Sequence, residues 1–210
     1  IVVRAPIGMN ATEEQKRSRN LLGADDLYTW YSVGESPRRQ VGLFLRHAFN
    51  RLTVVKKLNH FIDAQMKKRN VTDENLAIVG FSMGGAMGVQ AALRRKHKCA
   101  AVVCHSGTVL PFTKAKRKPD TLMIMGDQDE LFYLPSKKTT RKKLARKTSR
   151  ILKAFDKAGM KLKLHHEKSV KRLKKAGVAV TEKIFPDQDH RITEDSWREV
   201  TSFVTNKLKR

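Results

Sequence analysis

The feature that most constrains the fold is an apolar strand that turns directly into a helix at residues 76–94, which read LAIVGFSMGGAMGVQAALR. Further apolar runs follow in AAVVCHSG (100–107), TLMIMGDQDE (121–130) and VAVTEKIFPDQDH (178–190). Residues 197–208 carry an apolar stripe typical of a closing helix, namely Trp197, Val200, Phe203, Val204 and Leu208. Parallel strands need crossover connections, and these are usually helices, so the alternation predicts an α/β fold with a mostly parallel sheet and helices on both faces.

The first third of the chain is predicted to hold a short strand, a loop and a long helix. The strand in IVVRAP should end at Pro6 and Gly8, and residues 10–36 are polar and show no sustained period. From Pro37 to Met66, apolar residues recur every three to four positions, which predicts an amphipathic helix with a candidate break near Thr53. A length of 210 residues favours one domain spanning 1–210.

Ser82 is the candidate nucleophile. It stands at the centre of Gly-x-Ser-x-Gly, between a predicted strand and a predicted helix. In that setting the serine occupies a strained turn, and we expect Gly80 and Gly84 to be needed there because a Cβ would not fit, while Gly85 keeps the helix start clear. The N–H of Met83, at the helix N-terminus, is the candidate oxyanion donor.

A serine nucleophile needs a base and an acid that orients the base, and in this type of fold they follow in the order Ser, Asp, His at strand ends. His190 follows the last predicted strand and is the candidate base. Asp127 and Asp129 both follow the strand at 121–126; we favour Asp129 as the acid and expect Asp127 to shape the turn. Asp189 adjoins His190 too closely in sequence to orient it well.

The net charge of +24 is concentrated in one part of the chain. Residues 136–175 contain 17 Lys and Arg against two acids, Asp156 and Glu167. Such a block is typical of a surface that binds a polyanion such as RNA, because each Lys or Arg near a phosphate releases counterions. A solvated basic helix is one alternative, and a basic amphipathic helix at 141–158 lying on an anionic membrane is another.

These segments together resemble the phospholipase/carboxylesterase group of α/β-hydrolases, which includes the acyl-protein thioesterases. The resemblance is carried by VVRAP, VTDENLAIVGFSMGGAM, AAVVCHSGTVLP, MGDQDELF and LKKAGVAVTEKIFPDQDH. It implies cleavage of carboxylic esters or thioesters through an acyl-enzyme, with Ser82 as nucleophile, His190 as base and Asp129 as its partner. It also implies that no metal or organic cofactor is needed.

The chain departs from this family in two regions. No segment matches the family's N-terminal strands, including the one before its His-Gly oxyanion loop, so these strands are expected to be missing from the chain as given. The connection after the acid loop is about 25 residues longer than expected, which predicts a basic helical insertion at about 136–165. The predicted RNA contacts are Lys137, Lys138, Arg141, Lys142, Lys143, Arg146, Lys147, Arg150, Lys171, Arg172, Lys174 and Lys175.

Two functions therefore remain open on the sequence. One is a serine carboxylesterase or acyl-thioesterase with an RNA-binding insertion. The other is a catalytically idle component of a ribonucleoprotein, such as a mitochondrial ribosome, that contacts rRNA and neighbouring proteins. No apolar run is long enough to span a bilayer, and an intracellular location is expected, in the mitochondrion if the protein is ribosome-associated.

Other candidate sites are weaker. Cys99 and Cys104 lie five residues apart in an apolar run, which favours reduced, buried thiols over a disulfide. His165 and His166 are adjacent and would point to opposite faces of an extended segment, and no Cys or His set completes a tetrahedral site. The sequence therefore predicts no metal site.

Overall fold

The structure, a computed structural model, describes residues 7–8, 28–29, 37–109, 115–129 and 166–208, with side chains from residue 53 onward. The chain forms two compact units, residues 1–54 and 55–210. In the first unit, β1 (Ile7–Gly8) pairs antiparallel with β2 (Tyr28–Thr29). Strand β1 lies where the sequence predicted the end of a strand, and β2 lies within the segment predicted as a loop. Residues 1–6, where the strand was predicted, lie outside the described residues.

Helix α2 spans Pro37–Arg69 without interruption, so the expected break near Thr53 is wrong. Thr53 is exposed, and an exposed β-branched residue lowers helix stability only slightly. Near the end of α2, Asp63 accepts a hydrogen bond from the side chain of Arg95, a buried residue distant in sequence, at 2.8 Å. Arg95 also donates to Asp73 at 2.7 Å, which lies in the 3₁₀ turn η1 (Asp73–Asn75). These ion pairs join the end of α2 to the segment that leads into the sheet.

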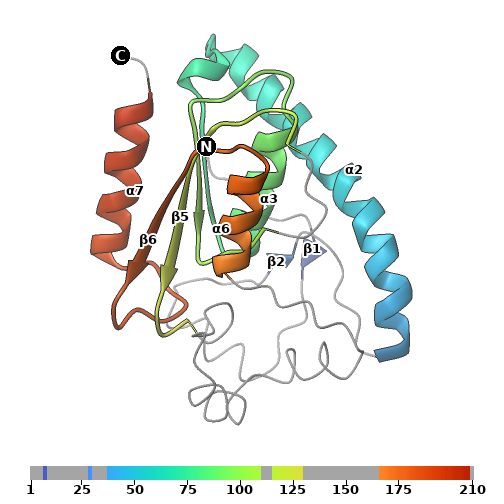
Figure 1. Ribbon diagram of the computed structural model, residues 1–210. Coiled ribbons are helices and arrows are strands. Elements are labelled where there is room, and N and C mark those ends of the chain that lie inside the picture. Colours follow the sequence, from blue (N-terminus) through green and yellow to red (C-terminus); the bar gives the residue numbers. More distant parts are fainter. Residues whose placement is uncertain (1–6, 9–27, 30–36, 110–114, 130–165, 209–210) are drawn as a thin grey trace. The chain divides into compact units, whose positions relative to one another are not determined.

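The second unit contains a four-stranded parallel sheet with the strand order β3-β4-β5-β6 (Figure 1). The strands are β3 (Ala77–Phe81), β4 (Ala101–His105), β5 (Asp120–Gly126) and β6 (Val180–Phe185). Helix α3 (Met83–Arg94) connects β3 to β4, and α6 (His166–Lys175) precedes β6. Helix α7 (Glu194–Lys207) follows the sheet. The predicted α/β class and parallel sheet are confirmed.

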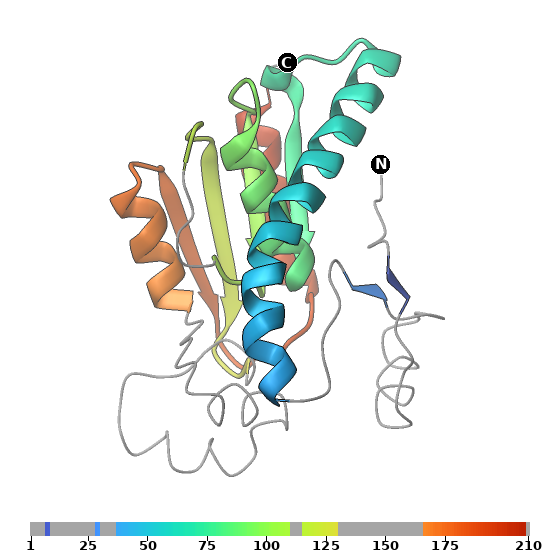
Figure 2. The ribbon, with the colours of Figure 1, turned by 90° about the vertical axis from the view of Figure 1, so that its right-hand side faces the viewer.

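Alternate residues of the central strands pack on opposite faces of the sheet, as the two-residue period of a strand requires. On one face Cys104 and Met123 pack with Leu93 of α3 and Leu173 of α6. On the other, Val103 and Ile124 pack with α7, and Figures 1 and 2 show the helices on the two sides.

Not every apolar position of the predicted stripe on α7 is in this core. Val200 is buried, and Phe203 and Val204 pack against it. Trp197 is 47% exposed and lies outside the core. The single-domain organisation of residues 1–210 stays a prediction, and the predicted insertion at 136–165 lies outside the described residues.

Candidate active site

Ser82 lies at the turn between β3 and α3 in a backbone conformation that side chains rarely adopt, with φ 53° and ψ −123°. It is the N-cap residue of α3, yet its hydroxyl makes no capping hydrogen bond. The turn is fastened to the end of β4 because the Ser82 N–H donates to the His105 carbonyl at 2.8 Å. A strained residue held by its surroundings is typical of functional sites.

The glycines around Ser82 differ in whether a side chain would fit at their positions. A Cβ on Gly80 would lie 2.3 Å from the Gly84 carbonyl oxygen. One on Gly85 would lie 2.8 Å from the Gly80 oxygen and 2.9 Å from the Cys104 sulfur. A Cβ on Gly84 would meet nothing within 4 Å. The predicted steric need at Gly84 is therefore wrong, and Gly85 has the tighter packing because it lies against β4.

The three residues that the sequence singled out form one hydrogen-bonded chain. His190 Nε2 lies 2.9 Å from the Ser82 hydroxyl oxygen, and His190 Nδ1 lies 2.8 Å from Asp129 Oδ2. Asp129 is fully buried, while the His190 side chain is 23% exposed. Phe81 packs beside the imidazole, with ring centroids 4.9 Å apart. A buried carboxylate, an imidazole and a hydroxyl in this order can pass a proton from the hydroxyl to the ring.

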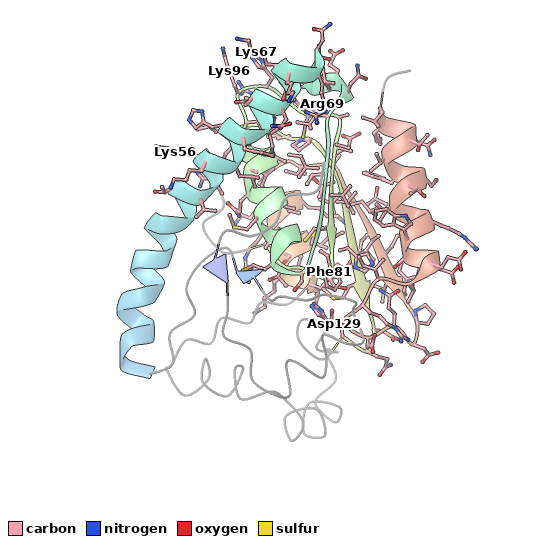
Figure 3. The ribbon with its side chains drawn as sticks, turned by 180° about the vertical axis from the view of Figure 1, so that it is seen from behind. Lys56, Lys67, Arg69, Phe81, Lys96 and Asp129 are labelled. Carbon is pink, nitrogen blue, oxygen red and sulfur yellow. The ribbon has the colours of Figure 1, made fainter. Side chains whose placement is uncertain are left out.

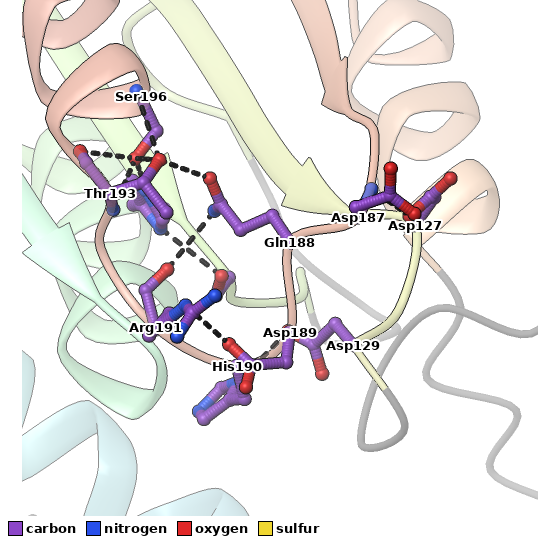
Figure 4. A network of polar contacts seen from close by, with 11 residues as sticks. Asp127, Asp129, Asp187, Gln188, Asp189, His190, Arg191, Thr193 and Ser196 are labelled. Carbon is purple, nitrogen blue, oxygen red and sulfur yellow. Dashed lines mark hydrogen bonds and ion pairs between the residues drawn. The ribbon is translucent and has the colours of Figure 1, made fainter. Parts of the chain in front are cut away.

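The alternative acids have other partners. Asp127 Oδ1 accepts a hydrogen bond from the Asp187 N–H at 2.9 Å, so it joins the turn after β5 to the turn after β6 (Figure 4). The exposed Asp189 pairs with Arg191 at 3.0 Å. Cys104 is also excluded as a nucleophile, because burial raises the pKa of its thiol to about 12.

A buried polar network, which the sequence analysis missed, lies next to His190 (Figure 4). The Gln188 side chain is 2% exposed and donates to the Arg191 carbonyl at 3.0 Å, across the position of His190. Its amide oxygen accepts from the Thr193 hydroxyl at 2.6 Å. Thr193 caps α7 in a capping box with Ser196. The loop that carries His190 is therefore held by side-chain bonds at both ends.

The network continues to a second buried histidine. His105 Nε2 lies 2.9 Å from the Ser196 hydroxyl, and Nδ1 lies 3.1 Å from the Ser106 hydroxyl. Burial, with a smaller contribution from His190, lowers the pKa of His105 to about 4. The ring is therefore neutral near pH 7. The Thr-x-x-Ser spacing before α7 was the one sequence signal that could have indicated part of this network.

The remaining predicted residues lie in separate places. Met83 is the first residue of α3. Of the predicted RNA contacts, those from Lys137 to Arg150 lie outside the described residues. On α6, Lys171 pairs with Glu167 at 2.6 Å, and Arg172 donates to the Val109 carbonyl at 2.9 Å. Lys174 and Lys175 are exposed at the end of this helix.

His166 is the buried first residue of α6 and lies 3.1 Å from a Glu182 oxygen. It therefore does not lie on the extended segment that the sequence analysis assumed. The described residues contain no group of three or more His, Cys, Asp or Glu that could hold a metal ion. Among them, too, no helix has both the length and the apolar content to cross a bilayer.

The chain is similar to known proteins in sequence profile and in fold. The sequence profile described as Phospholipase/Carboxylesterase matches residues 29–160, more than half of the chain. No curated protein sequence matches the chain.

Several solved structures share the fold at low sequence identity. The esterase PE8 is 19% identical with a TM-score of 0.61, over 86% of this chain and 71% of that one. SOBER1 of Arabidopsis thaliana is 20% identical with a TM-score of 0.60, over 90% and 78%. Acyl-protein thioesterase 2 of Zea mays is 14% identical with a TM-score of 0.54, over 90% and 77%.

Proposed function

Because the chain belongs to the phospholipase/carboxylesterase family, we propose that it is a serine hydrolase that cleaves carboxylic esters or thioesters through an acyl-enzyme. Ser82 is the nucleophile, His190 the general base and Asp129 the acid that orients it. The observation that carries the proposal is the hydrogen-bonded chain, 2.9 Å from Ser82 to His190 and 2.8 Å from His190 to Asp129.

In the proposed mechanism, His190 Nε2 takes the Ser82 proton as the oxygen attacks the acyl carbon. The Met83 N–H, at the N-terminus of α3, stabilises the oxyanion. His190 then gives the proton to the leaving alcohol or thiol, and a water molecule activated by the same ring releases the acid. Asp129 accepts a hydrogen bond from the His190 Nδ1–H throughout and stays ionised, which keeps the ring in the required tautomer.

The test is covalent labelling and turnover. Wild-type protein should react with a fluorophosphonate probe and hydrolyse a short-chain p-nitrophenyl ester. Ser82→Ala should abolish labelling and reduce turnover by about 1,000-fold or more. Ser202→Ala, a matched change at an exposed serine on α7, should leave both unchanged. Labelling that persists in Ser82→Ala would refute the assignment.

A second candidate function rests on the charge of residues 136–175, with 17 bases against two acids. We propose that the insertion at about 136–165 binds RNA, chiefly through the phosphate backbone. In the stronger form of this proposal the hydrolase site is idle, and the protein is a structural component of a ribonucleoprotein such as a mitochondrial ribosome. A mitochondrial location and contacts with neighbouring proteins belong to that form.

Two measurements separate these forms. An idle component should sediment with ribosomal particles at high salt while the wild-type protein turns over no ester and takes no label. A hydrolase with an RNA-binding insertion should show Ser82-dependent labelling. Its affinity for RNA should fall when the charges of the Lys and Arg side chains at 137–150 are reversed. RNA affinity unaffected by those reversals would remove the insertion as the contact.

A further inference from the structure

The register of the parallel sheet brings the segments that precede its strands to one edge. Ala77 pairs with Ala101, Ala101 with Asp120, and Thr121 with Val180. The ends of α2, α3 and α6 and the loop before β5 must therefore gather at the amino ends of the strands. Figure 3 shows the result: Lys67, Arg69 and Lys96 lie at one end of the sheet, and Phe81 and Asp129 at the other.

Four of the segments at this edge are basic. Residues 67–69, 96–98, 116–118 and 174–175 read KKR, KHK, KRK and KK, and all of their side chains are exposed. We call these four segments the amino-edge face. The neighbouring Asp73 is paired with the buried Arg95, and Asp120 is paired with Lys98 and Lys207. Glu74, in the turn before β3, is a third acid at this edge and is exposed, so nearby acids offset the charge of the face in part.

Three of the four segments of the amino-edge face are linked by backbone and side-chain contacts. The N–H groups of Lys116 and Arg117 donate to the Leu93 carbonyl at the end of α3. Arg117 Nε donates to the Lys96 carbonyl at 2.8 Å. Lys118 lies against the turn after α6, since a Cβ on Gly177 would be 2.7 Å from the Lys118 nitrogen. Residues 96 and 116–118 and the turn after α6 are therefore held next to one another.

Helix dipoles explain only part of this charge. Bases in the last turn of α2 and α6 are favoured by the partial negative charge at a helix C-terminus. Residues 96–98 and 116–118 lie in loops outside any helix, and the dipole gives no reason for their charge. A concentration of positive side chains is costly because they repel one another, and a polyanionic ligand relieves that repulsion.

The chemistry of the face favours a nucleic acid over a membrane. Among the described residues, the large apolar side chains that are exposed are Phe61, Val79, Ile184, Ile192 and Trp197, and none belongs to the four segments. A surface-bound membrane protein normally inserts such groups into the bilayer. The segments carry no Phe, Tyr or Trp, and His97 is their one aromatic ring, so contacts to phosphates should dominate.

We propose that the amino-edge face binds the sugar–phosphate backbone of a nucleic acid. The inference rests on the proposed association with RNA and adds to it a contact surface outside the insertion. The surface lies at the edge of the sheet opposite the Ser82–His190–Asp129 chain.

The test compares three charge-neutralised variants of the full chain by equilibrium binding to duplex RNA and duplex DNA of equal length. The face variant is Lys67→Gln, Lys96→Gln, Lys116→Gln, whose side chains are all exposed. The control, Lys168→Gln, Lys183→Gln, Arg198→Gln, removes equal charge elsewhere. The insertion variant is Lys142→Gln, Arg146→Gln, Arg150→Gln. Thermal melting checks that each variant is folded, and the single variant Lys96→Gln serves if the triple variant is not.

We expect the face variant to bind at least 10-fold more weakly than the control, and the slope of log K against log salt to fall by about 2 to 3, since each lost phosphate contact reduces it by about 0.9. Equal loss on RNA and DNA supports backbone recognition, and loss on RNA alone supports recognition of the RNA duplex. If the insertion variant alone loses affinity, the inference is overturned while the RNA proposal survives. If the face variant alone does, the inference stands without the insertion.

Binding of the wild-type protein and the face variant to phosphatidylserine vesicles is measured as well. Wild-type binding to vesicles but to neither duplex, lost in the face variant, would assign the face to a membrane surface and overturn the inference.

Discussion

Gln188 is the residue through which the loop carrying His190 is held. Its buried amide donates to the Arg191 carbonyl and accepts from the Thr193 hydroxyl, so one side chain spans the histidine. In the backbone, the Arg191 N–H donates to the Asp189 carbonyl at 2.8 Å, so the Gln188 side chain adds to a local bond across the same position. We therefore treat Gln188 as a positioning residue of the proposed hydrolase.

Gln188→Ala should reduce kcat by about 10- to 100-fold, because a displacement of the base by an ångström is enough for such a loss. KM should stay unchanged, since the side chain is 2% exposed and does not reach substrate. Leaving the Arg191 carbonyl and Thr193 hydroxyl without this partner should lower the free energy of unfolding by about 1–3 kcal/mol.

The matched control for this prediction is Gln128→Ala, which truncates an exposed glutamine in the turn after β5 and should change neither parameter. Steady-state kinetics and urea denaturation measure the two effects. A rise in KM at constant kcat would assign Gln188 to substrate binding instead.

His105 should make the stability of the fold sensitive to acid. Its pKa is lowered to about 4 by burial, whereas an unfolded histidine titrates near 6.5. Below pH 6.5 the unfolded chain therefore binds more protons than the native one. Stability attributable to His105 is complete above pH 6.5 and is lost as the pH falls to 4, by about 3 kcal/mol in all.

Urea denaturation between pH 4 and 7 tests this prediction. His105→Gln keeps a donor and an acceptor but does not titrate, so its stability curve should be flatter than that of wild type. A residual slope of the same sign is expected, because burial also lowers the pKa of His166. Identical slopes in the two proteins would contradict the prediction.

At the scale of residues, the sequence indicated the candidate hydrolase residues but not the hydrogen bonds that hold the loop of His190. Ser82, Asp129 and His190 could be proposed because a glycine-framed turn and two strand ends are visible in a single sequence, although their catalytic roles remain proposals. The bond from His105 to Ser196 joins residues 91 apart, and no local pattern encodes it, whereas the Thr-x-x-Ser spacing indicates only the cap of α7.

At the scale of elements, the contact between α3 and β4 depends on Gly85 and not on Gly84. Gly85→Ala forces a Cβ to 2.8 Å from a backbone oxygen, and a strained core typically loses about 1–3 kcal/mol or more. Gly84→Ala enters open space in the first turn of α3, where alanine favours the helix by up to about 1 kcal/mol.

Urea midpoints of the two variants therefore should move in opposite directions from wild type. The pair is internally matched, because each adds one methyl group to the same helix turn. Equal destabilisation by both would show that the turn at Ser82, and not the packing against β4, requires glycine.

The sequence predicted elements well where apolar residues were contiguous and poorly where tertiary contacts decided. Strands β4 and β5 are almost wholly buried and read as apolar runs. The continuity of α2 could not be read from its pattern. Its last turns are held by Arg95, which pairs with Asp63 of α2 and Asp73 of η1, and Arg95 is distant from the helix in sequence.

At the scale of the whole unit 55–210, the proposed active site and the amino-edge face occupy opposite ends of one parallel sheet. Strand β5 has seven residues, which separates the two edges by about 20 Å at 3.3 Å per residue. The Debye length is about 8 Å at physiological ionic strength, so the field of the face is largely screened at Ser82.

Binding at the amino-edge face should therefore leave hydrolysis unaffected. The rate of fluorophosphonate labelling of Ser82 in saturating duplex RNA should stay within about twofold of the rate without RNA at 0.15 M salt, because more than two Debye lengths separate the sites. At about 0.01 M salt the Debye length reaches about 30 Å, and an anionic ester should then react faster than its neutral analogue. The ratio of the two rates should be smaller in the variant Lys67→Gln, Lys96→Gln, Lys116→Gln. Inhibition of labelling by RNA at 0.15 M salt that this variant relieves would instead mean that the two edges are coupled through the sheet.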